Sequence, residues 1–142
     1  MGGKLTTLVR LQRWRIDEAR REIAALEKEA RDQTERITSL DAEFAAEMSH
    51  EIDDIVATTG RHAFVTSMLA ERDRRLADLA RLRADIGARR DALGELVWER
   101  RRLELRIEQI EREEAERARR QEANAMDDQA NIRFIAKSTR GS

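Results

Sequence analysis

The sequence predicts an all-α protein, a long antiparallel two-helix coiled-coil hairpin, on three observations. Of the 142 residues, 40% are charged and only 4% are aromatic, which leaves too little bulk for a thick globular core. The 28 basic residues nearly balance the 29 acidic residues, whereas disorder is favoured when charge is one-sided. Proline, the strongest helix breaker, is absent. The composition therefore favours long solvated helices over disorder.

In the first half of the chain, apolar residues recur at alternating spacings of four and three, the pattern of a coiled-coil seam. This pattern predicts a first helix over about residues 5–57, and an insertion of four residues after Phe44 locally unwinds the supercoil. The predicted seam positions are Leu5, Val9, Gln12, Ile16, Ala19, Ile23, Leu26, Ala30, Gln33, Ile37, Leu40 and Phe44.

The sequence Thr-Thr-Gly-Arg-His interrupts the pattern and predicts a turn at about residues 58–62. Folding back at Gly60 places position i opposite about position 120 − i, with both chain ends at one end of the hairpin. A parallel dimer of unbroken helices would satisfy the same heptads. Gly60 and the similar lengths of the two halves favour the hairpin.

The seam pattern resumes in a second predicted helix over about residues 63–121, which completes a hairpin of residues 1–122. Four arginines occupy seam positions, where the methylene stem can lie along the seam while the guanidinium reaches solvent. Beyond this, residues 123–142 lose the period and are expected to form a frayed or disordered tail. The predicted seam positions are Val65, Met68, Arg72, Arg75, Leu79, Leu82, Ile86, Arg89, Leu93, Leu96, Arg100, Leu103, Ile107 and Ile110.

Composition also bears on the compartment. The lack of cysteine excludes disulfides and thiol catalysis and fits a reducing compartment. No apolar run approaches the length of a membrane span or a signal-peptide core, so we expect a cytoplasmic protein without direct membrane insertion. The near-neutral net charge of −1 gives no reason to expect nucleic acid as a partner.

The chain shows no convincing catalytic or metal-binding pattern. Glu47 and His50 have the Glu-x-x-His spacing of carboxylate-bridged di-iron bundles, but a second such pair is missing, and a solvated helix face explains them better. Ser49, His50 and Asp53 would lie on one thin helix, where nothing forms a substrate pocket or an oxyanion hole. We therefore predict no enzyme activity, no cofactor and no metal.

Several large apolar residues fall outside the predicted seam. Leu8, Leu11 and Trp14 follow one another at a spacing of three on the outer face of the first helix, and Trp98 is outside the seam of the second. Exposed groups of this size form docking surfaces, although packing against arginine stems or the tail would also explain them. Basic residues around the stripe suggest an acidic partner surface.

The tip of the hairpin is a second candidate surface. Phe64, Met68 and Leu69 follow the predicted turn, and Asp53 and Asp54 precede it. These apolar residues could bind a partner, or they could close the end of the seam.

The opening segment, residues 5–21 (LTTLVRLQRWRIDEARR), resembles the start of the FliJ family, most closely its alphaproteobacterial form. The likeness continues in residues 99–104 (ERRRLE), where the family tends to carry a basic run before Leu-Glu. It also extends to residues 126–130 (MDDQA), where the family tends to read Leu-Asp-Glu-Ile-Ala, and Asp128 and Gln129 depart from that pattern.

The resemblance implies a soluble component of the flagellar type III protein export apparatus, with a hairpin like the central shaft of rotary ATPases. Implied partners are the hexameric flagellar export ATPase, an export gate membrane protein and export chaperones. The implied location is the cytoplasm, with association at the inner membrane periphery through this apparatus. Carried onto this chain, the ATPase end would comprise Leu8, Leu11, Arg13, Trp14, Arg15 and Trp98. The surface for the gate and the chaperones would comprise Phe64, Met68 and Leu69.

Two further readings remain open. One is a generic cytoplasmic coiled-coil chaperone or scaffold unrelated to motility, which would bind clients through the tip. The other is a nucleic-acid-binding hairpin that uses the basic first helix, which a salt-dependent shift of DNA or RNA would reveal.

Overall fold

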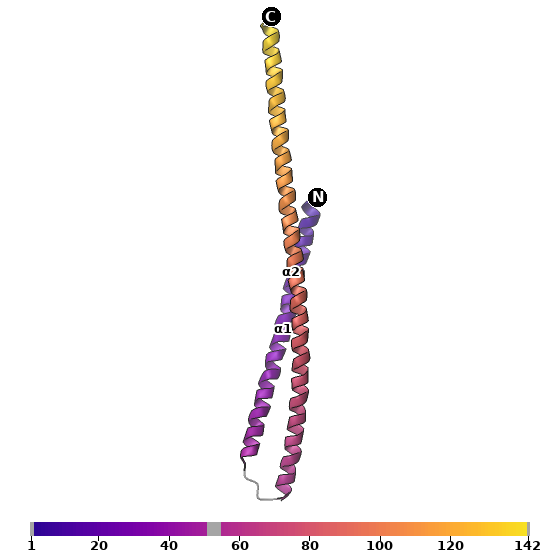
Figure 1. Cartoon of the computed structure of the whole chain (residues 1–142), viewed down its shortest axis with the longest axis vertical. Helices are drawn as coiled ribbons and strands as arrows, with labels where there is room; N and C mark the ends of the chain where they lie inside the picture. Colours follow the sequence, from indigo (N-terminus) through magenta and orange to yellow (C-terminus); the bar gives the residue numbers. More distant parts are fainter. Residues whose placement is uncertain (1, 51–54, 142) are drawn as a thin grey trace. The chain divides into compact units, whose positions relative to one another are not determined.

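The computed structural model consists of two long helices, α1 (Gly2–Ser49) and α2 (Ile55–Arg140) (Figure 1). It describes residues 2–50 and 55–141, and within these ranges only His50 and Gly141 lie outside the helices. No strand occurs in the described ranges. The chain divides into two units, of which unit 1 contains Met1–Arg13 and Trp98–Ser142 and unit 2 contains Trp14–Val97.

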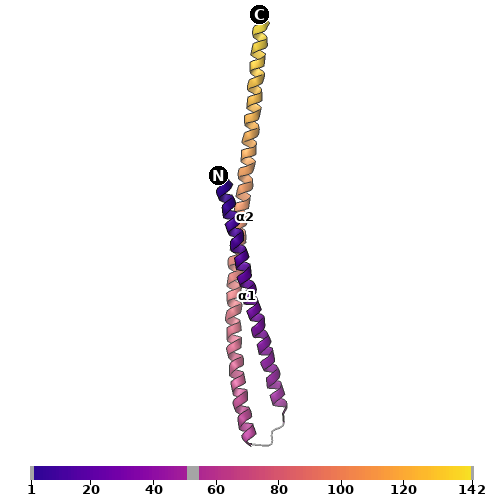
Figure 2. The ribbon, with the colours of Figure 1, turned by 180° about the vertical axis from the view of Figure 1, so that it is seen from behind.

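In unit 2, α1 and α2 run antiparallel and side by side, as both views of the ribbon show (Figures 1 and 2). The two helices carry the buried side chains of this unit at seam positions. This arrangement confirms the predicted all-α hairpin. The buried side chains of unit 2 are Ile16, Ile23, Ile37, Leu40, Met68, Leu79 and Ile86.

The seam follows the predicted frame closely. All twelve predicted positions of α1, from Leu5 to Phe44, are buried or half-buried. In α2, the predicted positions from Val65 to Ile110 are likewise buried or half-buried, and Arg89 alone is exposed. The spacing of three and four therefore located the packed face of both helices, because side chains at that spacing lie on one side of a helix.

The seam arginines of unit 2 reach polar partners across the helix pair. Arg72 Nε donates to Asp41 Oδ1 at 2.6 Å, and Arg75 Nη1 donates to Gln33 Oε1 at 3.1 Å. Arg89 Nη1 donates to Glu22 Oε2 at 2.7 Å. The guanidinium groups of Arg72 and Arg89 thus reach carboxylates beside the seam, whereas that of Arg75 pairs with Gln33 across it.

The connection between the helices differs from the predicted turn. α1 ends at Ser49, and residues 58–62, with Gly60, belong to the first turns of α2. Gly60 has no positive φ and tolerates helical geometry at a cost of about 1 kcal/mol relative to alanine, so it does not force a turn. Residues 51–54, which include Asp53, Asp54 and Ile52, lie outside the described residues.

The earlier connection shifts the pairing of the helices. Folding back at Gly60 predicts Glu22 opposite position 98, but Glu22 pairs with Arg89. In unit 1, Gln12 Nε2 donates to Glu99 at 3.1 Å, and Arg13 lies 3.6 Å from Glu104. Folding back at Gly60 predicts the start of α1 opposite about residue 114. The observed partners of the start of α1 come earlier in α2.

The C-terminal part of the chain is helical in unit 1, where a frayed tail and a helix end near 121 are predicted. α2 continues to Arg140, far past the start of α1 (Figure 2), and every described residue from 111 onward is exposed. Residues 95–140 contain neither glycine nor proline, and pairs such as Glu116 and Arg120, 2.7 Å apart, support an exposed helix locally. The start of α1 and the end of α2 consequently do not meet, and about thirty described residues of α2 have no described helical neighbour within unit 1.

Candidate partner-binding surfaces

In unit 1, the start of α1 presents apolar side chains away from its seam. Leu5 and Val9 face α2, whereas Leu8 and Leu11 remain 44% and 40% exposed. Trp98, the first residue of α2 in this unit, is 64% exposed. The predicted outward position of these three side chains is what the structure shows, and seam packing leaves them available to a partner.

Charged side chains accompany these apolar groups in unit 1. The guanidinium of Arg13 lies 3.6 Å from a carboxylate oxygen of Glu104, with most of the Arg13 side chain in solvent. Glu104 also lies 3.7 Å from Arg100 and 3.9 Å from Arg101. One carboxylate therefore faces three arginines, so local positive charge remains for an acidic partner.

In unit 2, Trp14 opens the α1 segment with 60% of its surface exposed, and Arg15 beside it is also exposed. Ile16, the next residue, has no exposed surface and anchors the seam. Trp14 follows Leu11 by three residues in one continuous helix. A tryptophan held on a rigid helix loses little conformational freedom on binding, which makes it an effective anchor for a partner.

The predicted tip residues separate into two kinds. Phe64 and Leu69 are exposed, at 45% and 44%, whereas Met68 is only 5% exposed and packs in the seam. Met68 therefore closes the core of the hairpin and is not accessible to a partner in this conformation. The accessible apolar surface near the start of α2 instead includes Ile55 and Val56, which the predicted turn at 58–62 had left inside the first helix.

The seam of unit 2 also contains a charged network around Glu71. Its carboxylate accepts a hydrogen bond of 3.1 Å from Arg75 and lies 3.4 Å from Arg36 on α1. Hydrogen bonding from Arg75, with the positive charge of Arg36, lowers the pKa of Glu71 below its ordinary value against a smaller opposing effect of burial. Arg36 also reaches Glu43 at 3.5 Å, so the network joins both helices.

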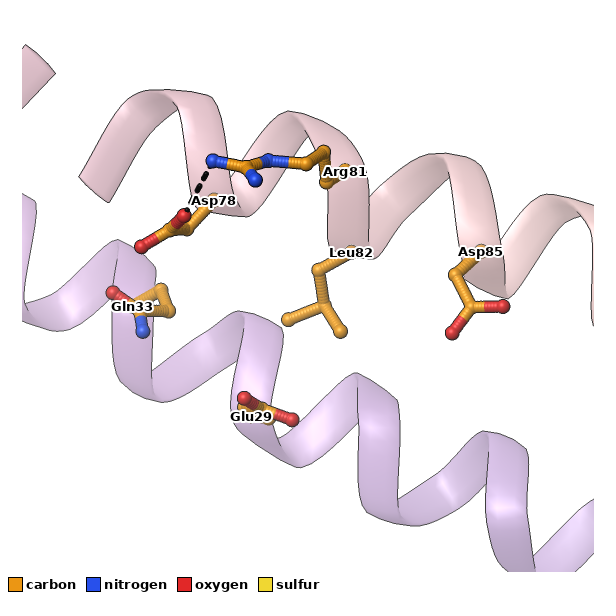
Figure 3. Close-up of a pocket in the computed structure, with 6 residues that line it drawn as sticks. All are labelled: Glu29, Gln33, Asp78, Arg81, Leu82 and Asp85. Atoms are coloured by element: carbon orange, nitrogen blue, oxygen red, sulfur yellow. Dashed lines mark hydrogen bonds and ion pairs between the residues drawn. The ribbon is translucent and has the colours of Figure 1, made fainter. Parts of the chain in front are cut away.

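A shallow polar groove runs between the helices of unit 2. Figure 3 shows Leu82 pointing toward α1 between two acidic side chains, Asp78 and Asp85, while Arg81 pairs with Asp78 at 2.9 Å. Glu29 and Gln33 line the α1 side. Across the described residues, no group of three or more histidine, cysteine or acidic side chains is arranged to hold a metal ion. Glu47, which has the Glu-x-x-His spacing with His50, lies in the last turn of α1, and His50 follows the end of that helix.

Sequence reasoning missed a further set of exposed apolar residues at the end of α2. Ile132, Phe134 and Ile135 are more than 60% exposed, as is Met126. They do not follow the seam spacing, so the sequence alone predicts a tail for this segment. The sequence does contain a signal for this surface, because three large apolar residues fall within four consecutive positions of an otherwise polar stretch.

The comparison with protein families decides the identity. The family described as "Flagellar FliJ protein" matches residues 1–139, which is nearly the whole chain. The chain belongs to the FliJ family. No curated protein and no solved structure matches it.

Membership in the FliJ family makes this protein a component of the flagellar export apparatus. It confirms the resemblance seen in the opening segment. The family is one of export components and not of enzymes. No helix in the described part of the chain is long and apolar enough to cross a lipid bilayer.

Proposed function

We propose that this FliJ protein is a stalk that couples the flagellar export ATPase to the export gate and escorts export chaperones. The observation that carries the proposal is the exposure of Leu8, Leu11 and Trp14 on a helix whose seam is already filled by α2. Packing within the hairpin does not account for these groups. Binding to the surface of a separate protein would account for their exposure.

The ATPase end of the stalk is assigned to the start of α1 and the neighbouring part of α2. Apolar groups there would fill the pore of a ring, and Arg13 and Arg15 would meet acidic groups on its wall. Trp98 supplies a further exposed aromatic anchor in unit 1. Arginine and tryptophan are the residue types that contribute most binding energy at protein interfaces.

The gate and chaperone surface is assigned to the exposed side chains near the beginning of α2. Phe64 and Leu69 fit this role because they are accessible, whereas Met68 contributes indirectly by holding α2 against α1. The proposal locates the protein in the cytoplasm and brings it to the inner membrane periphery through the export apparatus.

The decisive experiment measures ATP hydrolysis by the purified export ATPase as this protein is added. We expect stimulation by the wild type and its loss in a Leu11→Ala, Trp14→Ala double variant. A matched control, Val56→Ala with Leu76→Ala, removes two exposed apolar side chains elsewhere in unit 2 and should stimulate normally. Absence of stimulation by the wild type, or full stimulation by the double variant, would contradict the proposal.

The second surface needs a separate measurement. Phe64→Ser with Leu69→Ser should weaken binding to the soluble domain of the gate or to chaperones without changing ATPase stimulation. Met68→Ala should instead lower the free energy of unfolding by about 2–5 kcal/mol, the range for a buried methionine cut to alanine. Equal binding of gate and chaperones by the Phe64 and Leu69 variant would remove the tip from the proposal.

A further inference from the structure

The last turns of α2 differ in charge from the helix that precedes them. Residues 111–128 contain seven acidic and four basic residues. Residues 129–140 contain Arg133, Lys137 and Arg140 and no acidic residue at all. The boundary falls between Asp128 and Gln129, and the whole segment is helical and exposed.

The three basic residues lie on one side of this helical segment. Arg133, Lys137 and Arg140 are spaced i, i+4 and i+7, which places them in one stripe at about 100° per residue. Basic charge therefore forms a continuous line about two turns long. Residues 129–140 form the basic end of α2.

The apolar residues of the basic end occupy the opposite arc. Ile135 lies nearly opposite the stripe, because it is two residues from both Arg133 and Lys137, and Phe134 and Ile132 border the arc. Their exposed fractions are 63%, 71% and 66%, respectively. Between them stand only uncharged polar side chains. The basic end is thus an amphipathic helix with a cationic polar face.

The helix upstream argues against a partner helix as the occupant. A coiled coil would have to continue the seam frame past Ile110, but the next positions in that frame are Glu114, Arg117, Gln121 and Asn124. Apart from Met126, large exposed apolar side chains return only in the last three turns. The surface is therefore short, terminal and cationic, and it fits a planar anionic surface better than a long helix.

We propose that the basic end of α2 binds the surface of a membrane that contains anionic phospholipids. Ile132, Phe134 and Ile135 enter the boundary between headgroups and acyl chains, and Arg133, Lys137 and Arg140 contact the lipid phosphates. The acidic stretch up to Asp128 is repelled by the same surface, so contact is confined to the end of the helix. This inference is independent of the proposed ATPase interaction and does not involve a membrane span.

The test is sedimentation of the full-length chain with lipid vesicles. We expect binding to phosphatidylcholine vesicles that contain about 30% phosphatidylserine, weaker binding at about 0.5 M salt, and no binding to phosphatidylcholine alone. Arg133→Gln, Lys137→Gln, Arg140→Gln should reduce the partition coefficient on the order of 100-fold, at roughly five-fold for each charge. Phe134→Ser with Ile135→Ser should also reduce it.

The matched control removes the same charge from the preceding part of the helix. The triple variant Arg117→Gln, Arg119→Gln, Arg120→Gln leaves the basic end intact. It should bind anionic vesicles nearly as well as the wild type does. All of these positions are exposed, and the one ion pair lost, between Arg120 and Glu116, contributes only about 0.5 kcal/mol, so circular dichroism should show little change in helix content.

Three outcomes of the vesicle experiment would overturn the inference. They are no binding to anionic vesicles, equal binding to neutral vesicles, and an equal loss in the control and in the variant of the basic end. Binding of acidic polypeptide without binding of vesicles would assign the stripe to a protein partner and would also overturn it. ATPase stimulation measured in solution without lipid separates these results from failure of the proposed stalk function.

Discussion

Arg61, in the second turn of α2, donates a hydrogen bond of 2.8 Å from Nη2 to the backbone carbonyl of Glu47, in the last turn of α1. Its Nη1 donates to the carbonyl of His50 at 3.3 Å. The last carbonyls of a helix lack intrahelical partners and carry partial negative charge. One side chain of α2 therefore caps α1 and joins the two helices where the hairpin reverses.

Replacing Arg61 by alanine should loosen this end of the hairpin. We expect a loss of about 1 kcal/mol in the free energy of unfolding, because a charged donor to helix-terminal carbonyls contributes of this order at a half-exposed site. Urea denaturation of the wild type and the variant measures it. Amide hydrogen exchange in the variant should be faster than in the wild type in the last turn of α1, with a smaller change or none near Ile23.

The matched control is Arg74→Ala, which removes an exposed arginine from α2. It should change the free energy of unfolding by less than about 0.5 kcal/mol. A similar loss in both variants would show that Arg61 acts through general charge and not through the carbonyls of α1.

Polar pairs in the seam are expected to lower the stability of the hairpin and to fix the register in which its helices pair. Gln33 and Arg75 meet across the seam at 3.1 Å, and polar residues at such positions specify register at a cost in stability. Because Arg75 also donates to Glu71, the test uses a Glu71→Gln parent, in which that ion pair is already removed. In this parent, Gln33→Leu with Arg75→Leu should raise the midpoint of thermal unfolding by a few degrees, since well-packed apolar replacements of polar pairs are often stabilising. Calorimetry checks this prediction.

The same double variant should pair its two helices in more than one register. A cysteine pair introduced at Glu22 and Arg89, which face one another in unit 2, should cross-link efficiently in the parent protein and less cleanly once Gln33 and Arg75 are leucine. Sizing by light scattering would detect new oligomers. If stability falls, or if cross-linking stays uniform, the polar pair does not set the register.

The sequence predicted the seam well because heptad spacing is a local property of a helix. Among the described residues, every buried apolar side chain, from Val9 to Ile86, stands at a predicted position. The position at which the chain turns back is harder to predict from the sequence. Gly60 predicts a turn, yet glycine is only mildly unfavourable inside a helix. The cap on α1 comes from Arg61, through a contact between residues fourteen positions apart that no local pattern reveals.

The partner surfaces could be predicted in part for a similar reason. Leu11 and Trp14 were found because a residue outside a strict seam frame must face outward. Met68 was misplaced at the surface although it stood in the seam frame as well. Phe134 and its neighbours were missed because their apolar arc has no heptad frame, and only the helical continuation of α2 groups them.

Two glycines inside α2 offer a direct way to stabilise the hairpin. A methyl group added at Gly87 or Gly94 would meet no atom within 4 Å, and neither residue has positive φ. Each change to alanine should therefore raise the free energy of unfolding by about 1 kcal/mol through helix propensity. Urea denaturation of the single and double variants measures the gain, which should be additive.

The reverse change serves as the control. Ala88→Gly, next to Gly87 on the same exposed stretch, should lower the free energy of unfolding by about 1 kcal/mol. If Gly87→Ala and Gly94→Ala are stable but impair ATPase stimulation, the glycines serve a partner that approaches the backbone closely, and flexibility or close contact outweighs propensity there.

The network around Glu71 predicts loss of stability in acid. Hydrogen bonding from Arg75 and the charge of Arg36 lower the pKa of Glu71 in the folded protein relative to about 4.3 in an unfolded chain. The unfolded state therefore binds the proton more readily, so the contribution of Glu71 is fully present above the unfolded pKa. It disappears as the pH falls from that value through the lower folded pKa.

Replacing Glu71 by glutamine isolates this contribution. The wild type should be more stable than Glu71→Gln at pH 7, and the difference between their urea midpoints should shrink as the pH falls through the acidic range. Glu95→Gln, at an exposed position of α2, is the control and should follow the wild type across the range. Because Glu71 contacts both Arg36 and Arg75, a constant difference between wild type and Glu71→Gln down to strongly acidic pH would mean that shape and hydrogen bonding at this position matter, and charge does not.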